Sequence, residues 1–208
     1  MVKAFSRHGK DNSSFLVKQV EQRAILHFFR IQTNSNKFYI MEFQLGVGES
    51  SYRIYTEYGR MGSSPRKHER CFLTRLEARH EFDRILSTKR NKGYELVFIE
   101  EDWDENTGLP LETSPQNKTI SSSLSLYTQL GKLSHIQLHK GIQILTEIEE
   151  NILKGVIDMI DLTNQFYSVI PVVFENQQDR TNLLDTLEKV QAKKDWLHGM
   201  ITANPTNF

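Results

Sequence analysis

The sequence has 208 residues, enough for one large or two small domains, and its 38% hydrophobic and 25% charged content is ordinary for a globular protein. The 26 basic residues equal the 26 acidic ones, which argues against a strongly basic nucleic-acid-binding protein. The single cysteine, Cys71, excludes an intrachain disulfide and a cysteine-based zinc site and suits a reducing, intracellular compartment. Apolar runs all fall short of the roughly 18 residues that a membrane-spanning helix needs, so no membrane contact is expected.

The charge is unevenly distributed along the chain. Residues 37–93 contain 12 Lys and Arg against 7 Asp and Glu, an excess of five positive charges. An anionic partner is therefore expected to bind this region. The first 13 residues are polar and are interpreted as a disordered tail or, alternatively, as a weak organellar presequence. Residues 15–32 fit either a short helix or a β-strand, and the pattern does not decide between them.

Residues 37–45 and 52–58 are rich in β-forming residues and predict two strands joined through GVGESS. A tight turn is expected at Tyr58-Gly59-Arg60, followed by a basic loop that contains Arg66 and Lys67. An aromatic ring and a guanidinium on either side of a glycine suit a phosphate beside a sugar or base. The simpler alternative is a β-turn whose tyrosine packs on a neighbouring strand and whose arginine is solvated.

A helix is predicted after a short strand at residues 71–73. Thr74 and Glu77 fit a capping box at its start, and Gly93 follows basic residues at its end. Its expected apolar stripe is Leu76, Phe82, Ile85 and Leu86, and residues 94–99 resemble a final strand. Antiparallel strands with one packed helix predict a small α+β domain, assigned to residues 36–100 after an N-terminal extension at 1–35.

Residues 101–123 are acidic and then rich in Ser, Thr and Pro, and predict a linker that Trp103 anchors to a domain. Residues 124–202 predict an all-α bundle of three helices. Ser134 and Gln137 fit a capping box at the start of the first helix, and Gly155 is expected to end it. Pro171 is expected to end the second helix, at 157–171, and the third helix extends to Met200. The expected core stripe of the first helix is Leu138, Ile142, Leu145, Ile148 and Ile152.

Two parts of the chain, together covering residues 36–200, resemble a known family. The strand, the Y-G-R-M-G turn and the capped helix with K-G-Y-E resemble a WGR domain. That family is named for a Trp-Gly-Arg turn, and in this sequence Tyr58 stands at the position of the Trp. The second half resembles the helical regulatory domain of DNA-dependent poly(ADP-ribose) polymerases. The segments that carry these resemblances are 37–45, 73–95, 129–134, 160–171 and 189–197.

The resemblance implies a role for each residue of the turn. In the family, the WGR turn contacts sugar-phosphate at a DNA break and its arginine touches the regulatory helices. Carried over, Tyr58 stacks on the terminal sugar or base, Arg60 bridges towards DNA or the helices, and Arg66 and Lys67 contact phosphate. Gly59, which lets the flanking ring and guanidinium project from one backbone corner, completes the predicted nucleic-acid site. By the same resemblance, the chain lacks the family's ADP-ribosyltransferase domain with its His-Tyr-Glu triad, and its regulatory domain is truncated.

Two functions follow as alternatives. The first is a non-catalytic poly(ADP-ribose) polymerase relative that binds DNA breaks through the Tyr-Gly-Arg turn and acts as an adaptor, in the nucleus by family resemblance. The second is a structural subunit of a large assembly, which uses both domains to bind protein. A location in a cytoskeletal or organellar assembly then stands as the alternative to the nucleus. An enzyme is not expected, because GVGESS lacks the lysine and helix of a phosphate-binding loop. No cofactor, metal or small-molecule substrate is expected.

Overall fold

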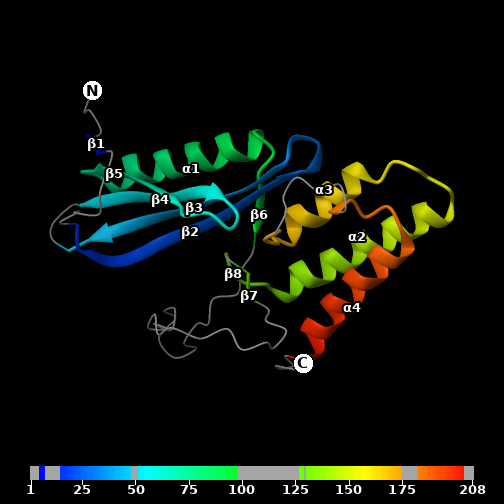
Figure 1. The fold of residues 1–208 in the computed structure, drawn as a ribbon. Coiled ribbons are helices and arrows are strands. Elements are labelled where there is room, and N and C mark those ends of the chain that lie inside the picture. The colour runs from blue at the N-terminus through cyan, green and yellow to red at the C-terminus, as the bar shows by residue number, and fades with distance from the viewer. Residues whose placement is uncertain are drawn as a thin grey trace. The chain divides into compact units, whose positions relative to one another are not determined.

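The computed structural model describes residues 5–7, 15–47, 51–97, 127–128, 130–174 and 182–203. The chain divides into two compact units, Met1–Val97 and Phe98–Phe208. Figure 1 labels their helices and strands and colours the chain by residue number. The predicted order of an antiparallel sheet with a helix followed by a helical bundle, an α+β fold, is confirmed. Among the described residues, no helix has the length and apolar character to cross a membrane.

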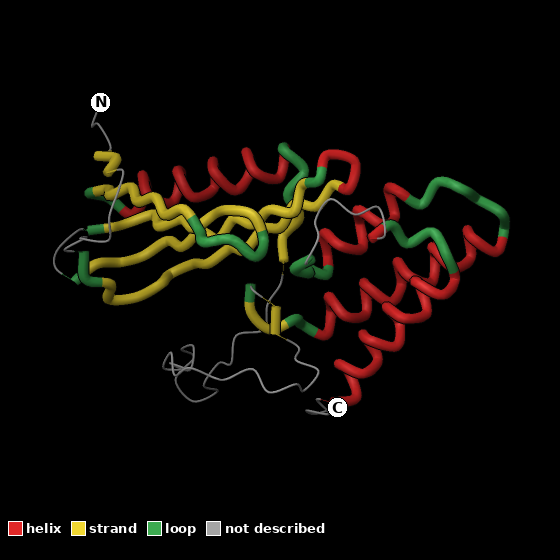
Figure 2. The backbone as a smooth tube through the Cα atoms, in the orientation of Figure 1, coloured by secondary structure: helices red, strands yellow, loops and turns green. Residues whose placement is uncertain are grey.

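The first unit contains a six-stranded antiparallel sheet in the order β1-β5-β4-β3-β2-β6. Its strands are yellow in Figure 2. One helix, α1 (Arg75–Asn91), runs along one face of this sheet in Figure 1. The strands are β1 (Phe5–Arg7), β2 (Val17–Arg30), β3 (Ser35–Gly46), β4 (Tyr52–Arg60), β5 (Arg66–Phe72) and β6 (Glu95–Val97).

The sheet begins before residue 36, where we expected the domain to start. Residues 17–30 form β2, which pairs with β3 from Val17 opposite Gly46 to Arg30 opposite Ser35. The register shifts between Val17 and Gln19 and again between Val20 and Gln22. Such bulges break the two-residue alternation that identifies a strand, which explains why the sequence left helix and strand open here. Part of the expected N-terminal tail also pairs, as β1, with β5.

The core of the first unit lies between the sheet and α1. Thr74 caps the helix by accepting a hydrogen bond from the Glu77 amide, and Gly93, at φ 84°, ends it as predicted. The predicted Leu76 is not in the core: it is 66% exposed, and Ala78 takes the buried position. The buried cluster consists of Ala24, Leu26, Tyr39, Met41, Phe43, Ile54, Ala78, Phe82 and Ile85.

The second unit contains α2 (His135–Leu153), α3 (Ile160–Val169) and α4 (Leu187–Ala203), with a small pair of strands, β7 (Tyr127–Thr128) and β8 (Gly131–Lys132). The capping box of Ser134 and Gln137 is confirmed. The Gln137 amide also donates to the Val169 carbonyl at 3.0 Å, which ties α2 to the end of α3.

Two details of the helical unit differ from the expected pattern. Ile144 is buried, whereas the predicted Ile142 and Ile152 are only partly buried. The helix expected at residue 157 begins at Ile160, and Ile157 is 93% exposed. The predicted linker at 101–123, with Trp103, lies outside the described residues.

Candidate nucleic-acid interface

Tyr58, Gly59 and Arg60 are strand residues and not the turn that the sequence predicted. They end β4 and pair with Tyr39, Phe38 and Lys37 of β3. The turn follows them: the Ser63 amide donates to the Arg60 carbonyl at 3.1 Å, and Gly62 takes a φ of 79°. Gly62 is therefore the glycine that the left-handed turn requires.

The strand geometry divides the five predicted site residues between two faces of the sheet. Successive side chains of a strand point to opposite faces, so Tyr58 and Arg60 share one face and Gly59 lies on the other. Arg66 is opposite Tyr58 across β5 and shares its face, whereas Lys67 is opposite Glu57 on the other face. Lys67 lies 3.9 Å from the Glu57 carboxylate. The structure thus brings together Tyr58, Arg60 and Arg66.

Tyr58 is held in place by aromatic packing. Its ring stacks on Tyr39 with centroids 5.5 Å apart and planes 21° from parallel. The Lys89 ammonium lies 3.7 Å from the Tyr39 ring centroid and 5.8 Å from that of Tyr58. Burial, with the nearby Lys92 charge, lowers the pKa of Lys89, and burial raises the pKa of Tyr39. Tyr58 is half-buried and forms the edge of the core at the end of the sheet.

Arg60 fixes the neighbouring β2–β3 connection. Its Nη2 donates to the Asn34 carbonyl at 2.8 Å, and Asn34 takes the left-handed conformation at φ 47° that ends the short 3-10 turn Ile31–Thr33. Lys37 is directly opposite Arg60 in the β3–β4 ladder. Two like charges opposite each other in a sheet destabilise it, so an anion between them would relieve the repulsion.

Two lysines were not among the site residues predicted from the sequence: Lys37, which belongs to this cationic end of the sheet, and Lys89, which lies beside its Tyr39–Tyr58 pair. Lys37 acquires its place through the β3–β4 register and Lys89 through the docking of α1. The available signal was the local positive charge of residues 37–93, which indicates a region and not individual residues.

Two domain models match the chain. Residues 22–98 match the WGR domain, and residues 122–203 match the poly(ADP-ribose) polymerase regulatory domain. The first match includes β2 from Gln22 onwards, in agreement with the sheet. The matched order, WGR domain and then regulatory domain, is the order expected from the sequence.

Similar proteins include several poly(ADP-ribose) polymerases. Poly(ADP-ribose) polymerase 2-A of Oryza sativa subsp. japonica is 25% identical over 89% of this chain. Poly(ADP-ribose) polymerase 1 of Caenorhabditis elegans is 22% identical over 86% of it, and poly(ADP-ribose) polymerase 1 of Xenopus laevis is 34% identical over 35% of it. The matched region spans 35%, 23% and 7% of these three relatives' own lengths. The chain therefore contains a WGR domain followed by a poly(ADP-ribose) polymerase regulatory domain and is homologous to part of the poly(ADP-ribose) polymerases.

Proposed function

We propose that the first unit binds broken DNA at the cationic end of its sheet, formed by Lys37, Tyr58, Arg60 and Arg66, and that the chain is a nuclear adaptor that supplies no transferase chemistry itself. The observation that carries this proposal is the like-charged pair of Lys37 and Arg60 next to an anchored aromatic ring. Cations position the phosphate backbone, and an aromatic face accepts a sugar or an unstacked base. The similarity to poly(ADP-ribose) polymerases supports the same partner.

The decisive variant combines Lys37→Gln with Arg66→Gln. Neither side chain makes a hydrogen bond or ion pair to another described residue, so the fold should not depend on them. We expect binding of a nicked, 5′-phosphorylated duplex to weaken by about 10- to 100-fold near physiological salt, and the log–log salt slope to fall by about two. Fluorescence anisotropy from low to physiological salt measures both quantities.

The matched control combines Lys18→Gln with Arg79→Gln, which removes two exposed positive charges of the same unit away from this end of the sheet. It should bind like the wild type. An intact closed duplex shows whether binding requires a break. Tyr58→Leu, which keeps an apolar side chain but removes the stacking face, should reduce the preference for the nick. Equal binding of nicked and closed duplex, or equal losses in the two double variants, would contradict the proposal.

A role as a structural subunit is the second candidate, because one specific feature favours it. Leu153 is the last residue of α2, and Val156 and Ile157 follow just after it; the three are 70%, 46% and 93% exposed. Grouped exposed apolar side chains indicate a protein-binding surface. If the chain is such a subunit, it should co-purify in a large complex at high salt, and Leu153→Ser with Ile157→Ser should release it. Ile136→Ser, 72% exposed at the other end of α2, is the control. Release by salt alone would contradict this role.

A further inference from the structure

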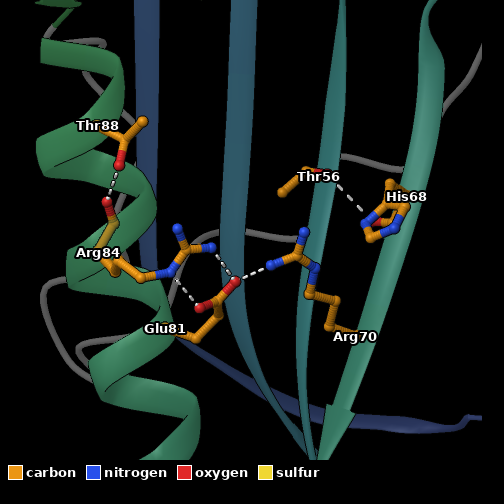
Figure 3. A network of polar contacts seen from close by, with 6 residues as sticks. All are labelled: Thr56, His68, Arg70, Glu81, Arg84 and Thr88. Atoms are coloured by element: carbon orange, nitrogen blue, oxygen red, sulfur yellow. Dashed lines mark hydrogen bonds and ion pairs between the residues drawn. The ribbon is translucent and has the colours of Figure 1, made fainter. Parts of the chain in front are cut away.

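A groove lies between α1 and the strands β4 and β5, and its lining includes Tyr39 and Lys89, which lie beside Tyr58. Its volume is about 170 Å³. Tyr39, Ile54 and Thr56 contribute from the sheet interior, and the remaining lining comes from β5 and α1, as the close-up in Figure 3 partly shows. The charged lining residues are Arg70, Arg84 and Lys89.

One carboxylate holds the two guanidiniums of this groove. Arg84 donates from Nε to Glu81 Oε2 and from Nη2 to Glu81 Oε1, each at 2.7 Å. Arg70 Nη1 donates to the same Oε1, so the Glu81 side chain lies between the two arginines (Figure 3). Among the described residues, Nε and Nη2 of Arg70 have no partner. The triad therefore carries one net positive charge and keeps free N–H donors.

Lys89 adds a second positive charge, and no carboxylate of the described residues pairs with it. Within the described part of the chain, its ammonium contacts only aromatic rings, those of Tyr39, Tyr58 and Tyr94 at 3.7, 5.8 and 5.3 Å from the centroids. Burial is the main cause that lowers its pKa, so the charged form is poorly solvated. An anion in the groove would supply the missing counter-charge.

The two threonine hydroxyls of the groove already donate to backbone carbonyls. Thr56 donates its hydroxyl proton to the His68 carbonyl at 3.1 Å, and Thr88 donates to the Arg84 carbonyl at 2.7 Å. The charged donors to a ligand are therefore the three cations, and the Tyr39 hydroxyl and the His68 side chain are the other polar groups of the lining. Two uncompensated positive charges match a dianion better than a monoanion.

We propose that this groove binds the dianionic phosphate group of a small phosphomonoester. A phosphate monoester carries close to two negative charges at neutral pH, equal to the uncompensated charge of the groove. The volume is below that of ordinary sites for drug-sized ligands, so it suits one phosphate with a small substituent. This site goes beyond the proposed DNA interface, because it uses Arg70, Arg84 and Lys89 and not Lys37 or Arg66.

Isothermal titration calorimetry of the full chain at constant ionic strength tests the proposal, with inorganic phosphate and ribose 5-phosphate as the two sources of the group and nitrate as the monoanion. Lys89→Gln and Arg84→Gln should each weaken phosphate binding by about 10- to 100-fold, the usual effect of losing a hydrogen bond to a charged group. Glu81→Gln should strengthen it, because it removes the competing carboxylate. Arg79→Gln, on the same helix but paired with Asp83, should bind like the wild type.

Several results would overturn the proposal. These are no saturable heat with phosphate, equal binding of nitrate, or equal losses in Arg79→Gln and Lys89→Gln. Displacement of phosphate by an unnicked duplex whose ends carry hydroxyls would also overturn it, since that duplex offers only phosphodiesters. Circular dichroism shows whether each variant is folded. If either Lys89→Gln or Arg84→Gln fails to fold, the other variant still tests the proposal. The Lys37→Gln, Arg66→Gln variant should retain phosphate binding, so failure here and failure of DNA binding are distinguishable.

Discussion

Replacing Phe82 with alanine is expected to lower the free energy of unfolding of the first unit by about 3–5 kcal/mol. Phe82 is completely buried in the cluster between α1 and the sheet. Truncation removes the transfer free energy of the ring and leaves a cavity, because the strands on the other side cannot follow the lost volume. Native-state hydrogen exchange of the α1 and β3 amides measures the change within this unit, which a single melting temperature of a two-unit chain does not.

Leu76→Ala on the same helix is the matched control. Both residues belong to the apolar stripe expected from the sequence, yet Leu76 is 66% exposed whereas Phe82 is completely buried. Its truncation should change the free energy of unfolding by no more than about 0.5 kcal/mol, as for most surface substitutions. Similar losses for Leu76→Ala and Phe82→Ala would contradict the observed orientation of α1 on the sheet.

Features that short stretches of sequence determine could be predicted. Thr74 and Ser134 cap their helices as expected, and Gly93 and Gly155 take positive φ values of 84° and 77° after helix ends. Each signal requires only residues within one helical turn of each other. The order of sheet and helices followed from such local patterns.

Features set by partners far apart in the sequence could not be predicted. Gly59 looks like a turn glycine in isolation, but its place in β4 is decided by Phe38 on β3. β2 was ambiguous because its bulges hide the alternation that its pairing with β3 restores. The same limit explains the site: Lys37 reaches Arg60 through the strand register, and the groove joins Arg70 of β5 to Lys89 of α1.

Gly141→Val is expected to destabilise the helical unit by about 3 kcal/mol. Glycine lowers the stability of a helix interior by roughly 0.5–1 kcal/mol relative to alanine, so its place in the middle of α2 requires a packing reason. A Cβ at this position would lie 3.0 Å from Ile170 Cγ1 and 3.2 Å from Leu197 Cδ1. Both neighbours are completely buried, so neither can move aside without displacing others. Inserting carbon atoms into such a contact costs about 1–3 kcal/mol, and a branched side chain lies at the upper end.

Gln143→Val is the control for the lower helix propensity of valine, because Gln143 is exposed on the same helix. Its replacement should cost less than about 1 kcal/mol, and any larger loss in Gly141→Val is then steric.

A double-mutant cycle then locates the contact. Ile170→Val removes Cδ1, which lies 3.1 Å from the Cβ position. The Gly141→Ala, Ile170→Val pair should therefore lose less stability than the sum of the single variants. Additive losses, measured by hydrogen exchange of the α2 amides, would show that α2 and the Ile170 segment do not approach this closely and that Gly141 is not required for their packing.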